Sequence, residues 1–168
     1  MLGGNLAAVA SLWARDHSDI SIQHQLLLNP VTAYYPDNES FSTYSRAFWM
    51  EHCPTGAGGY PLSTEDMAWY WHRYLRSDVD AEHPYAVPLQ ARELADSPPA
   101  TVVTSELDPL RDEGQAYARR LTDAGVPVKH IEYEGVFHSF LALWHELDRA
   151  NTALAEVSNR ITTALNGG

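Results

Sequence analysis

Asp108 and His138 are the two side chains of this sequence whose types and positions best suit acid–base chemistry. Each follows a run of residues typical of a β-strand: residues 101–104 precede Asp108, and residues 128–133 precede His138. In an open parallel sheet, functional residues gather just beyond the carboxyl ends of the strands. A carboxylate in that position can fix the tautomer of a neighbouring imidazole and stabilise the imidazolium formed during acyl transfer. We therefore expect these two side chains to meet in space.

Both residues also have a simpler structural interpretation. A carboxylate before a helix is most often an N-cap, and a histidine between aromatic residues is most often packed in the core. The fixed backbone of Pro109 would place Asp108, and Gly135 would permit the turn that presents His138. Glu106, which lies two residues before Asp108, is a second candidate for the acid.

The elements around these residues are expected to alternate between strands and helices. The patterns predict strands over residues 25–29, 101–104 and 128–133, and helices over residues 6–14, 67–75, 112–124 and 140–165. Ser63 and Asp66 have the spacing of a capping box before the helix at 67–75. Residues 31–95 mix aromatic residues with proline and glycine, which is typical of inserted loops with short helices. The alternation predicts a mostly parallel α/β sheet with right-handed crossovers, flanked by helices.

Three segments resemble motifs of the hormone-sensitive-lipase-like α/β-hydrolases, the bacterial family IV esterases. Residues 106–118 (ELDPLRDEGQAYA) resemble the catalytic-acid segment, residues 135–140 (GVFHSF) the histidine loop G-M-x-H-G-F, and residues 3–7 (GGNLA) the end of the nucleophile motif G-D-S-A-G-G-N-L-A. The motifs follow the family's order and span essentially the whole chain. The resemblance implies Ser–His–Asp acyl transfer, with Asp108 rather than Glu106 as the acid and His138 as the base. Ser139 stands where the family usually has glycine.

The same alignment shows which parts of the family's site have no counterpart here. Aligned on residues 3–5, the nucleophile serine falls on Met1, and one oxyanion donor falls on the backbone of Leu2. The H-G-G-G oxyanion loop and the first half of the sheet are absent. A serine needs a neighbouring base, and each oxyanion donor contributes about two to three orders of magnitude in rate. The resemblance therefore predicts that residues 1–168 form one truncated α/β-hydrolase domain that is inactive alone.

Other residues suggest further sites, each with a structural alternative. The aromatic residues at 69–71, with Tyr74, would line a substrate pocket by resemblance, or simply pack an amphipathic helix on the core. Cys53 stands beside His52, but adjacent side chains on an extended chain point in opposite directions, so a thiol nucleophile is not expected. His145 follows the candidate base by seven residues, and no carboxylate completes a metal-binding pattern. We expect no metal and no cofactor.

Composition limits the partners and the location of the chain. Its 168 residues contain 11 Lys and Arg against 22 Asp and Glu, a net charge of -11 that argues against nucleic acid as a partner. A single cysteine allows no internal disulfide and fits a reducing cytoplasm. No apolar run reaches the roughly 18 residues of a membrane helix, and residues 1–14 lack the basic region of a signal peptide.

Two functional hypotheses remain. In the first, the chain belongs to a carboxylic ester hydrolase for small to medium acyl esters, and its N-terminal half comes from a separate polypeptide or from sequence upstream of a misplaced start. In the second, it is a non-catalytic remnant or a module that binds a partner, such as a second copy, through an exposed sheet edge. A self-sufficient small enzyme is the weakest hypothesis, because residues 2–168 offer no evident nucleophile.

Overall fold

A three-stranded parallel sheet forms the centre of the molecule. The structure is a computed structural model that describes residues 2–52 and 61–166. Its strands are β1 (Gln25–Leu28), β2 (Ala100–Leu107) and β3 (Val128–Phe137), and their order in the sheet is β1-β2-β3. The register pairs Leu27 with Val102 and Val102 with His130. The mostly parallel α/β sheet expected from the alternation of patterns is therefore confirmed.

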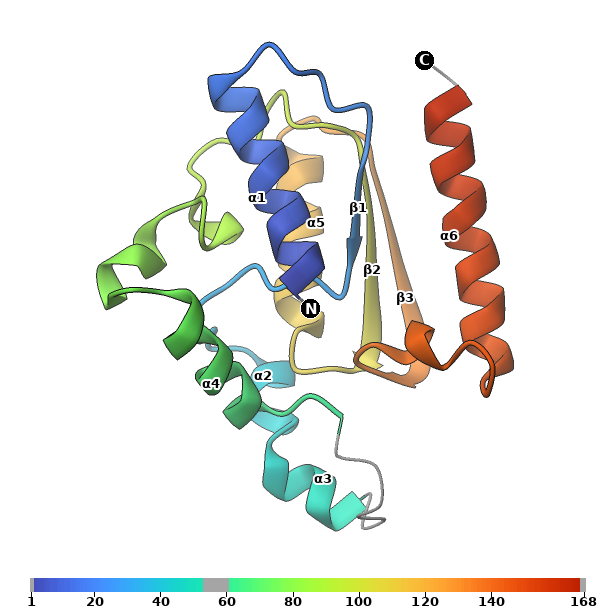
Figure 1. Cartoon of the computed structure of the whole chain (residues 1–168). Helices are drawn as coiled ribbons and strands as arrows, with labels where there is room; N and C mark the ends of the chain where they lie inside the picture. Colours follow the sequence, from blue (N-terminus) through green and yellow to red (C-terminus); the bar gives the residue numbers. More distant parts are fainter. Residues whose placement is uncertain (1, 53–60, 167–168) are drawn as a thin grey trace.

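Helices cover both faces of this sheet. The helices α1 (Leu2–His17) and α5 (Arg111–Asp123) lie on one face, and α6 (Asp148–Asn166) lies on the other (Figure 1). Side chains from α1, the sheet and α5 form the main apolar cluster, which includes Ala8, Leu12, Leu27, Val102, Tyr117 and Leu121. Gly125 follows α5 with a φ of 81°, a left-handed backbone that glycine adopts without strain and that ends the helix.

The described part of the segment between β1 and β2 consists of short helices and loops, as predicted for residues 31–95. It contains α2 (Glu39–Thr43), α3 (Arg46–His52), α4 (Thr64–Tyr74) and the 3-10 helices η1 (Asp78–Glu82) and η2 (Pro88–Gln90). The predicted capping box begins α4, because the Ser63 N–H donates to the Asp66 carboxylate while the Asp66 N–H donates to the Ser63 hydroxyl. Met67 and Trp71 then pack against Val31 and Leu110, which fastens the insertion to the loops at the carboxyl ends of the strands.

Two predicted boundaries near the candidate base are wrong. Strand β3 continues to Phe137 instead of ending at Tyr133. Gly135, which was interpreted as part of a turn, lies in a bulge of this strand. The helix expected from residue 140 begins only at Asp148, after the 3-10 helix η3 (Phe140–Leu143). Phe140 is buried beside Ala150, so the chain turns between these two residues and the predicted helix is interrupted there. None of the described helices is both long and apolar enough to cross a membrane.

Candidate active site

The structure brings Asp108 and His138 together at the carboxyl edge of the sheet. Asp108 is the first residue after β2, and His138 is the first residue after β3. Oδ2 of Asp108 lies 2.8 Å from Nδ1 of His138. The carboxylate is fully buried, and the imidazole is 7% exposed. The meeting of these two side chains follows from the parallel topology, which places the carboxyl ends of β2 and β3 side by side (Figure 1).

Three donors hold the Asp108 carboxylate. Besides His138, the Nδ2 of Asn29 donates to Oδ2 at 2.7 Å, and the N–H of Leu110 donates to Oδ1 at 2.9 Å. The bond from Leu110 spans two residues and closes an Asx turn around Pro109, so the carboxylate does not act as the N-cap of α5. Hydrogen bonds to a charged acceptor are stronger than neutral ones, and together they fix the direction in which Asp108 faces the imidazole.

The sequence interpretation missed Asn29. It follows β1 at the same edge of the sheet, and its backbone has a φ of 42°, a left-handed conformation that asparagine adopts more readily than most residues. Its Nδ2 also donates to the Ser105 hydroxyl at 2.9 Å, so one amide bridges β2 and the acid. A polar residue directly after a buried strand, at the edge that carries Asp108, was the available signal.

Nε2 of the imidazole remains available for chemistry. Because Nδ1 contacts the carboxylate, the Nδ1–H tautomer leaves Nε2 as a lone-pair acceptor. Among residues 2–52 and 61–166, no other side chain or backbone group hydrogen-bonds to the His138 ring. The arrangement can therefore take a proton at Nε2 while Asp108 stabilises the resulting imidazolium.

A bulge in β3 presents His138. Ser105 pairs with Tyr133 and Leu107 pairs with Phe137, so β3 carries two more residues than β2 between these pairs. Gly135 lies in this bulge with a φ of 68°, instead of in the turn predicted from the sequence. Glu106, the rival acid, accepts a hydrogen bond from the Gly135 N–H at 2.6 Å. Of the two acidic candidates, Asp108 is therefore the one that contacts the imidazole.

The residues that resemble the end of a nucleophile motif fix the start of α1 beside this edge. A Cβ on Gly4 would lie 2.9 Å from Cα of Pro30 and 3.0 Å from the Leu28 carbonyl oxygen, so only glycine allows the close approach. Nδ2 of Asn5 donates to the carbonyls of Val31 at 2.9 Å and Ala86 at 3.0 Å. These contacts place the first turn of α1 against the loop that begins with Asn29. Met1, onto which the serine position falls, lies outside the described residues.

Glu113 is a buried carboxyl group that also went unpredicted. Its Oε1 accepts from the N–H groups of Thr32 at 2.6 Å and Ala33 at 3.1 Å, and Oε2 has no partner among the described residues. Burial raises the pKa of this carboxyl from 4.5 to about 8, against the opposing effect of the two N–H donors. A sequence signal existed, because Glu113 lies on the same helical stripe as the buried Tyr117 and Leu121.

None of the remaining described candidates hydrogen-bonds to Asp108 or His138. Trp71 belongs to a buried apolar cluster and also lines a cavity of about 380 Å³ with Tyr34, whereas Trp69 is exposed and stacks under Arg73. Cys53 lies outside the described residues, and no group of three or more His, Cys, Asp or Glu side chains in the described parts of the chain could hold a metal ion.

Comparison with known proteins decides the family. The family model of the alpha/beta hydrolase fold matches residues 2–142. The chain belongs to this hydrolase family. An arylesterase of Saccharolobus solfataricus is 34% identical over 140 residues, which cover 83% of this chain and 42% of the relative. Our expected resemblance to the bacterial family IV esterases is thereby confirmed.

Solved structures agree with this assignment. A thermophilic carboxylesterase cloned from a metagenomic library matches with a TM-score of 0.83 at 32% identity, over 98% of this chain and 52% of the other. An esterase of Pyrobaculum calidifontis matches with a TM-score of 0.81 at 34% identity, over 96% of this chain and 48% of the other. This member of the hydrolase family therefore spans about half the length of the proteins it matches.

Proposed function

We propose that this chain supplies the acid and the base of a carboxylic ester hydrolase. One observation carries the proposal: Oδ2 of Asp108 lies 2.8 Å from Nδ1 of His138, with Nε2 unpartnered among the described residues. Relatives described as an arylesterase and a carboxylesterase support the reaction class. The substrates we propose are small to medium acyl esters.

In the proposed mechanism, Nε2 of His138 accepts the proton of a serine hydroxyl as the serine oxygen attacks the ester carbonyl. Asp108 stabilises the imidazolium through Nδ1–H. The imidazolium then returns the proton to the departing alkoxide, which leaves an acyl-serine. Water attacks the acyl group by the same route, with His138 again the base, and releases the carboxylic acid. No step calls for a metal or an organic cofactor.

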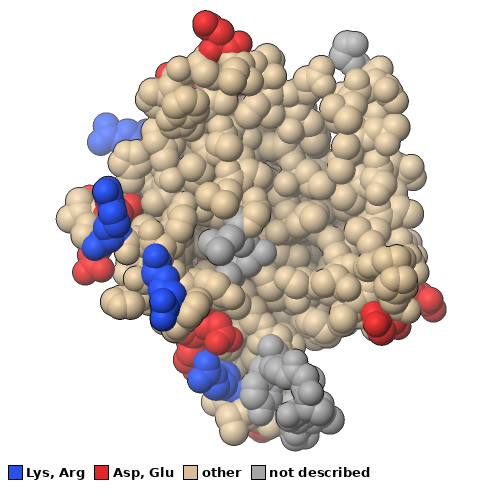
Figure 2. Space-filling view, viewed as in Figure 1, with Lys and Arg blue, Asp and Glu red and all other residues tan. Residues whose placement is uncertain are grey.

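We further propose that the nucleophile and the oxyanion donors lie outside residues 2–168, so that the chain is inactive alone. The edge of β1 supports this proposal. In the described structure β1 pairs with β2 alone, and Leu26 and Leu28 on the α6 side of the sheet are only half-buried. In the view of Figure 2, charged side chains gather at the periphery of the face on which α1 and β1 lie nearest the viewer. A largely uncharged strand edge suits a missing half of the domain.

The same edge supports the alternative function, a non-catalytic remnant or a partner-binding module. An unpaired strand offers backbone N–H and C=O groups to a second chain, either a separate N-terminal half or another copy. On this alternative, the Asp108–His138 pair would be retained from an ancestral enzyme and would catalyse no reaction. The two functions differ in what the DNA before the Met1 codon encodes.

The deciding experiment is to sequence that DNA and translate its three frames. An in-frame Gly-Asp-Ser segment and a glycine-rich oxyanion loop are expected, and the longer protein should hydrolyse p-nitrophenyl acetate and hexanoate. Asp108→Asn and His138→Ala should each lower kcat by about 10⁴-fold. His145→Ala, which changes an exposed imidazole seven residues after His138, should leave kcat unchanged.

Several results would contradict the proposal. Turnover that survives His138→Ala would remove the base from the mechanism. Turnover by the 168-residue chain, lost on changing one internal serine to alanine, would show that the chain has its own nucleophile. Absence of both segments from all three upstream frames would favour the partner-binding module, which sedimentation of the purified chain would then test.

A further inference from the structure

Glu106 is an acidic residue beside the acid–base pair that has no role in the proposed chemistry. It lies in β2 two residues before the acid, and it is the single residue of β2 between the pairs Ser105–Tyr133 and Leu107–Phe137. Opposite it, β3 has three residues, 134–136. Such a bulge breaks the ladder of backbone hydrogen bonds and leaves N–H groups that need another acceptor.

The carboxylate of Glu106 supplies that acceptor. Its Oε2 lies 2.6 Å from the N–H of Gly135, in a charge-assisted hydrogen bond. At the other end of the same peptide unit, the Arg149 guanidinium donates to the carbonyl of Glu134. A side chain of β2 and a side chain of α6 therefore hold the two ends of the same peptide unit, and the left-handed backbone of Gly135 is fixed from outside β3.

The place of the imidazole depends on this peptide unit. His138 follows Gly135 by three residues, and the intervening Val136 is buried against Ala150 and Phe140. Asp108, by contrast, is held by Asn29 and by its own Asx turn, independently of β3. A rotation at Gly135 would therefore move His138 relative to a stationary carboxylate and lengthen the 2.8 Å contact. Displacements of about 1 Å in a reacting group can cost about 100-fold in rate.

We propose that Glu106 is a positioning residue, which holds the β3 bulge and thereby keeps the His138 imidazole in register with Asp108. The proposal rests on the proposed function only for its catalytic consequence. The positioning itself is a property of the described chain, and it assigns to Glu106 a task different from that of the acid.

The test is NMR of the ¹⁵N-labelled 168-residue chain. In the native chain, the His138 Nδ1–H proton should give a downfield resonance that exchanges slowly with water, and the Gly135 amide should be protected. Glu106→Ala should speed exchange of both protons at least tenfold. Glu106→Gln, whose amide oxygen can still accept from Gly135, should restore most of the protection. Glu106→Asp keeps the charge but shortens the side chain by one methylene, so it should behave like the alanine variant.

A control variant separates positioning from general stability. Glu51→Ala changes an exposed glutamate on α3 and should leave both protons as in the native chain. Unchanged exchange at His138 and Gly135 in folded Glu106→Ala, or in Glu106→Asp if the alanine variant does not fold, would overturn the proposal. Equal loss of protection in Glu106→Gln and Glu106→Ala would also overturn it.

The longer enzyme separates this proposal from the proposed function. Glu106→Ala should lower its kcat by about 10- to 100-fold with KM nearly unchanged. If Glu106→Ala disturbs the His138 proton while His138→Ala leaves hydrolysis intact, the proposed function fails and the positioning stands. If hydrolysis needs His138 but Glu106→Ala leaves exchange of the His138 proton unchanged, the positioning proposal fails and the proposed function stands.

Discussion

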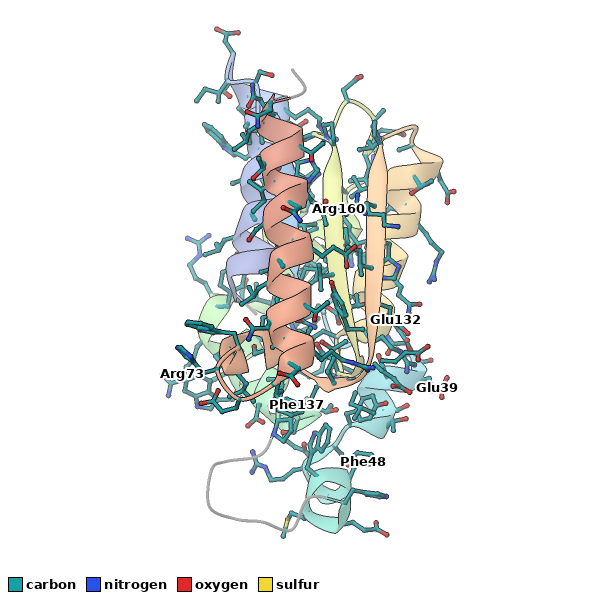
Figure 3. The ribbon with its side chains drawn as sticks, turned by 90° about the vertical axis from the view of Figure 1, so that its right-hand side faces the viewer. Glu39, Phe48, Arg73, Glu132, Phe137 and Arg160 are labelled. Carbon is teal, nitrogen blue, oxygen red and sulfur yellow. The ribbon has the colours of Figure 1, made fainter. Side chains whose placement is uncertain are left out.

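The two faces of the sheet are built differently. On one face, α1 and α5 enclose the sheet along its length, and Leu12, Leu27, Val102, Tyr117 and Leu121 are almost completely buried there. On the other face, the described apolar cluster lies only at the carboxyl end, where Val136 and Phe140 pack against Ala150 and Ala153 of α6. Farther along, α6 and the amino ends of the strands border a hollow of about 500 Å³ lined by Arg160, Thr101 and Val128 (Figure 3).

This difference shows which face of the sheet the described residues cover completely and which they cover only in part. The face that carries α1 and α5 reaches interior-like packing within the described chain, so its helices are held by the sheet and by each other. On the face that carries α6, the apolar cluster lies where it supports the loop of His138, and Val103 and Val157 are buried as well. The acid–base pair therefore sits at the well-packed end of both faces, which explains its buried and fully hydrogen-bonded carboxylate.

The largest expected effect tests this contrast directly. Leu121→Ala on α5 removes a side chain with 0% exposure and should lower the free energy of unfolding by about 2–5 kcal/mol. Leu165→Ala on α6, at 57% exposure, is the matched control and should cost less than about 0.5 kcal/mol. Urea unfolding followed by circular dichroism measures both. Similar losses for the two variants would show that the faces are equally packed in solution.

Much of this arrangement could be predicted from local patterns. The alternation of strand and helix fixed the parallel topology, and the topology placed Asp108 and His138 at a common edge. The Ser63–Asp66 capping box was also readable, because its residues are close in sequence and satisfy each other. Each of these predictions depends on short-range spacing or on a general property of parallel sheets.

The unpredicted features depend on tertiary contacts. Asn29 bonds to Asp108 across 79 positions of the chain, and Glu113 bonds to Thr32 across 81. The β3 bulge was missed because Gly135 has the same left-handed φ in a bulge as in a turn, and only the pairing of Phe137 with Leu107 distinguishes them. Pattern reasoning shows where a residue type is unusual, but its partner comes from the fold.

A second prediction concerns the pH dependence of stability that follows from the burial of Glu113 on α5. Because the folded pKa of Glu113 is about 8 and the ordinary value is 4.5, the folded chain keeps a proton that the unfolded chain loses between these values. Its contribution to stability is therefore complete below pH 4.5 and is lost as pH rises to about 8, by at most about 1.4 kcal/mol for each pH unit. The free energy of unfolding should fall between pH 6.5 and 8.5 in urea titrations.

The window from pH 6.5 avoids an opposing effect. Burial lowers the pKa values of His24 and His130 below 6.5, so these two groups make stability rise with pH below that value. Glu113→Gln cannot ionise and should flatten the slope above pH 6.5, whereas Glu39→Gln, an exposed carboxylate on α2, should leave it as in the native chain. A native slope that persists in Glu113→Gln would assign the titration to another group.

The smallest effect concerns the backbone on the α6 side of the site. Ser139 has a φ of 62° directly after His138, at the position where the family's motif usually has glycine. A left-handed backbone costs a residue with a Cβ roughly 1–2 kcal/mol, and glycine avoids this cost. Glycine also has more freedom in the unfolded chain, which offsets part of the stability gained by the substitution. Ser139→Gly should therefore raise the free energy of unfolding by about 1 kcal/mol. Ser158→Gly, within the regular helix α6, should lower it by roughly 0.5 kcal/mol. If both variants lose stability, the left-handed turn after His138 is not where strain is stored, and the serine must make a compensating contact in solution.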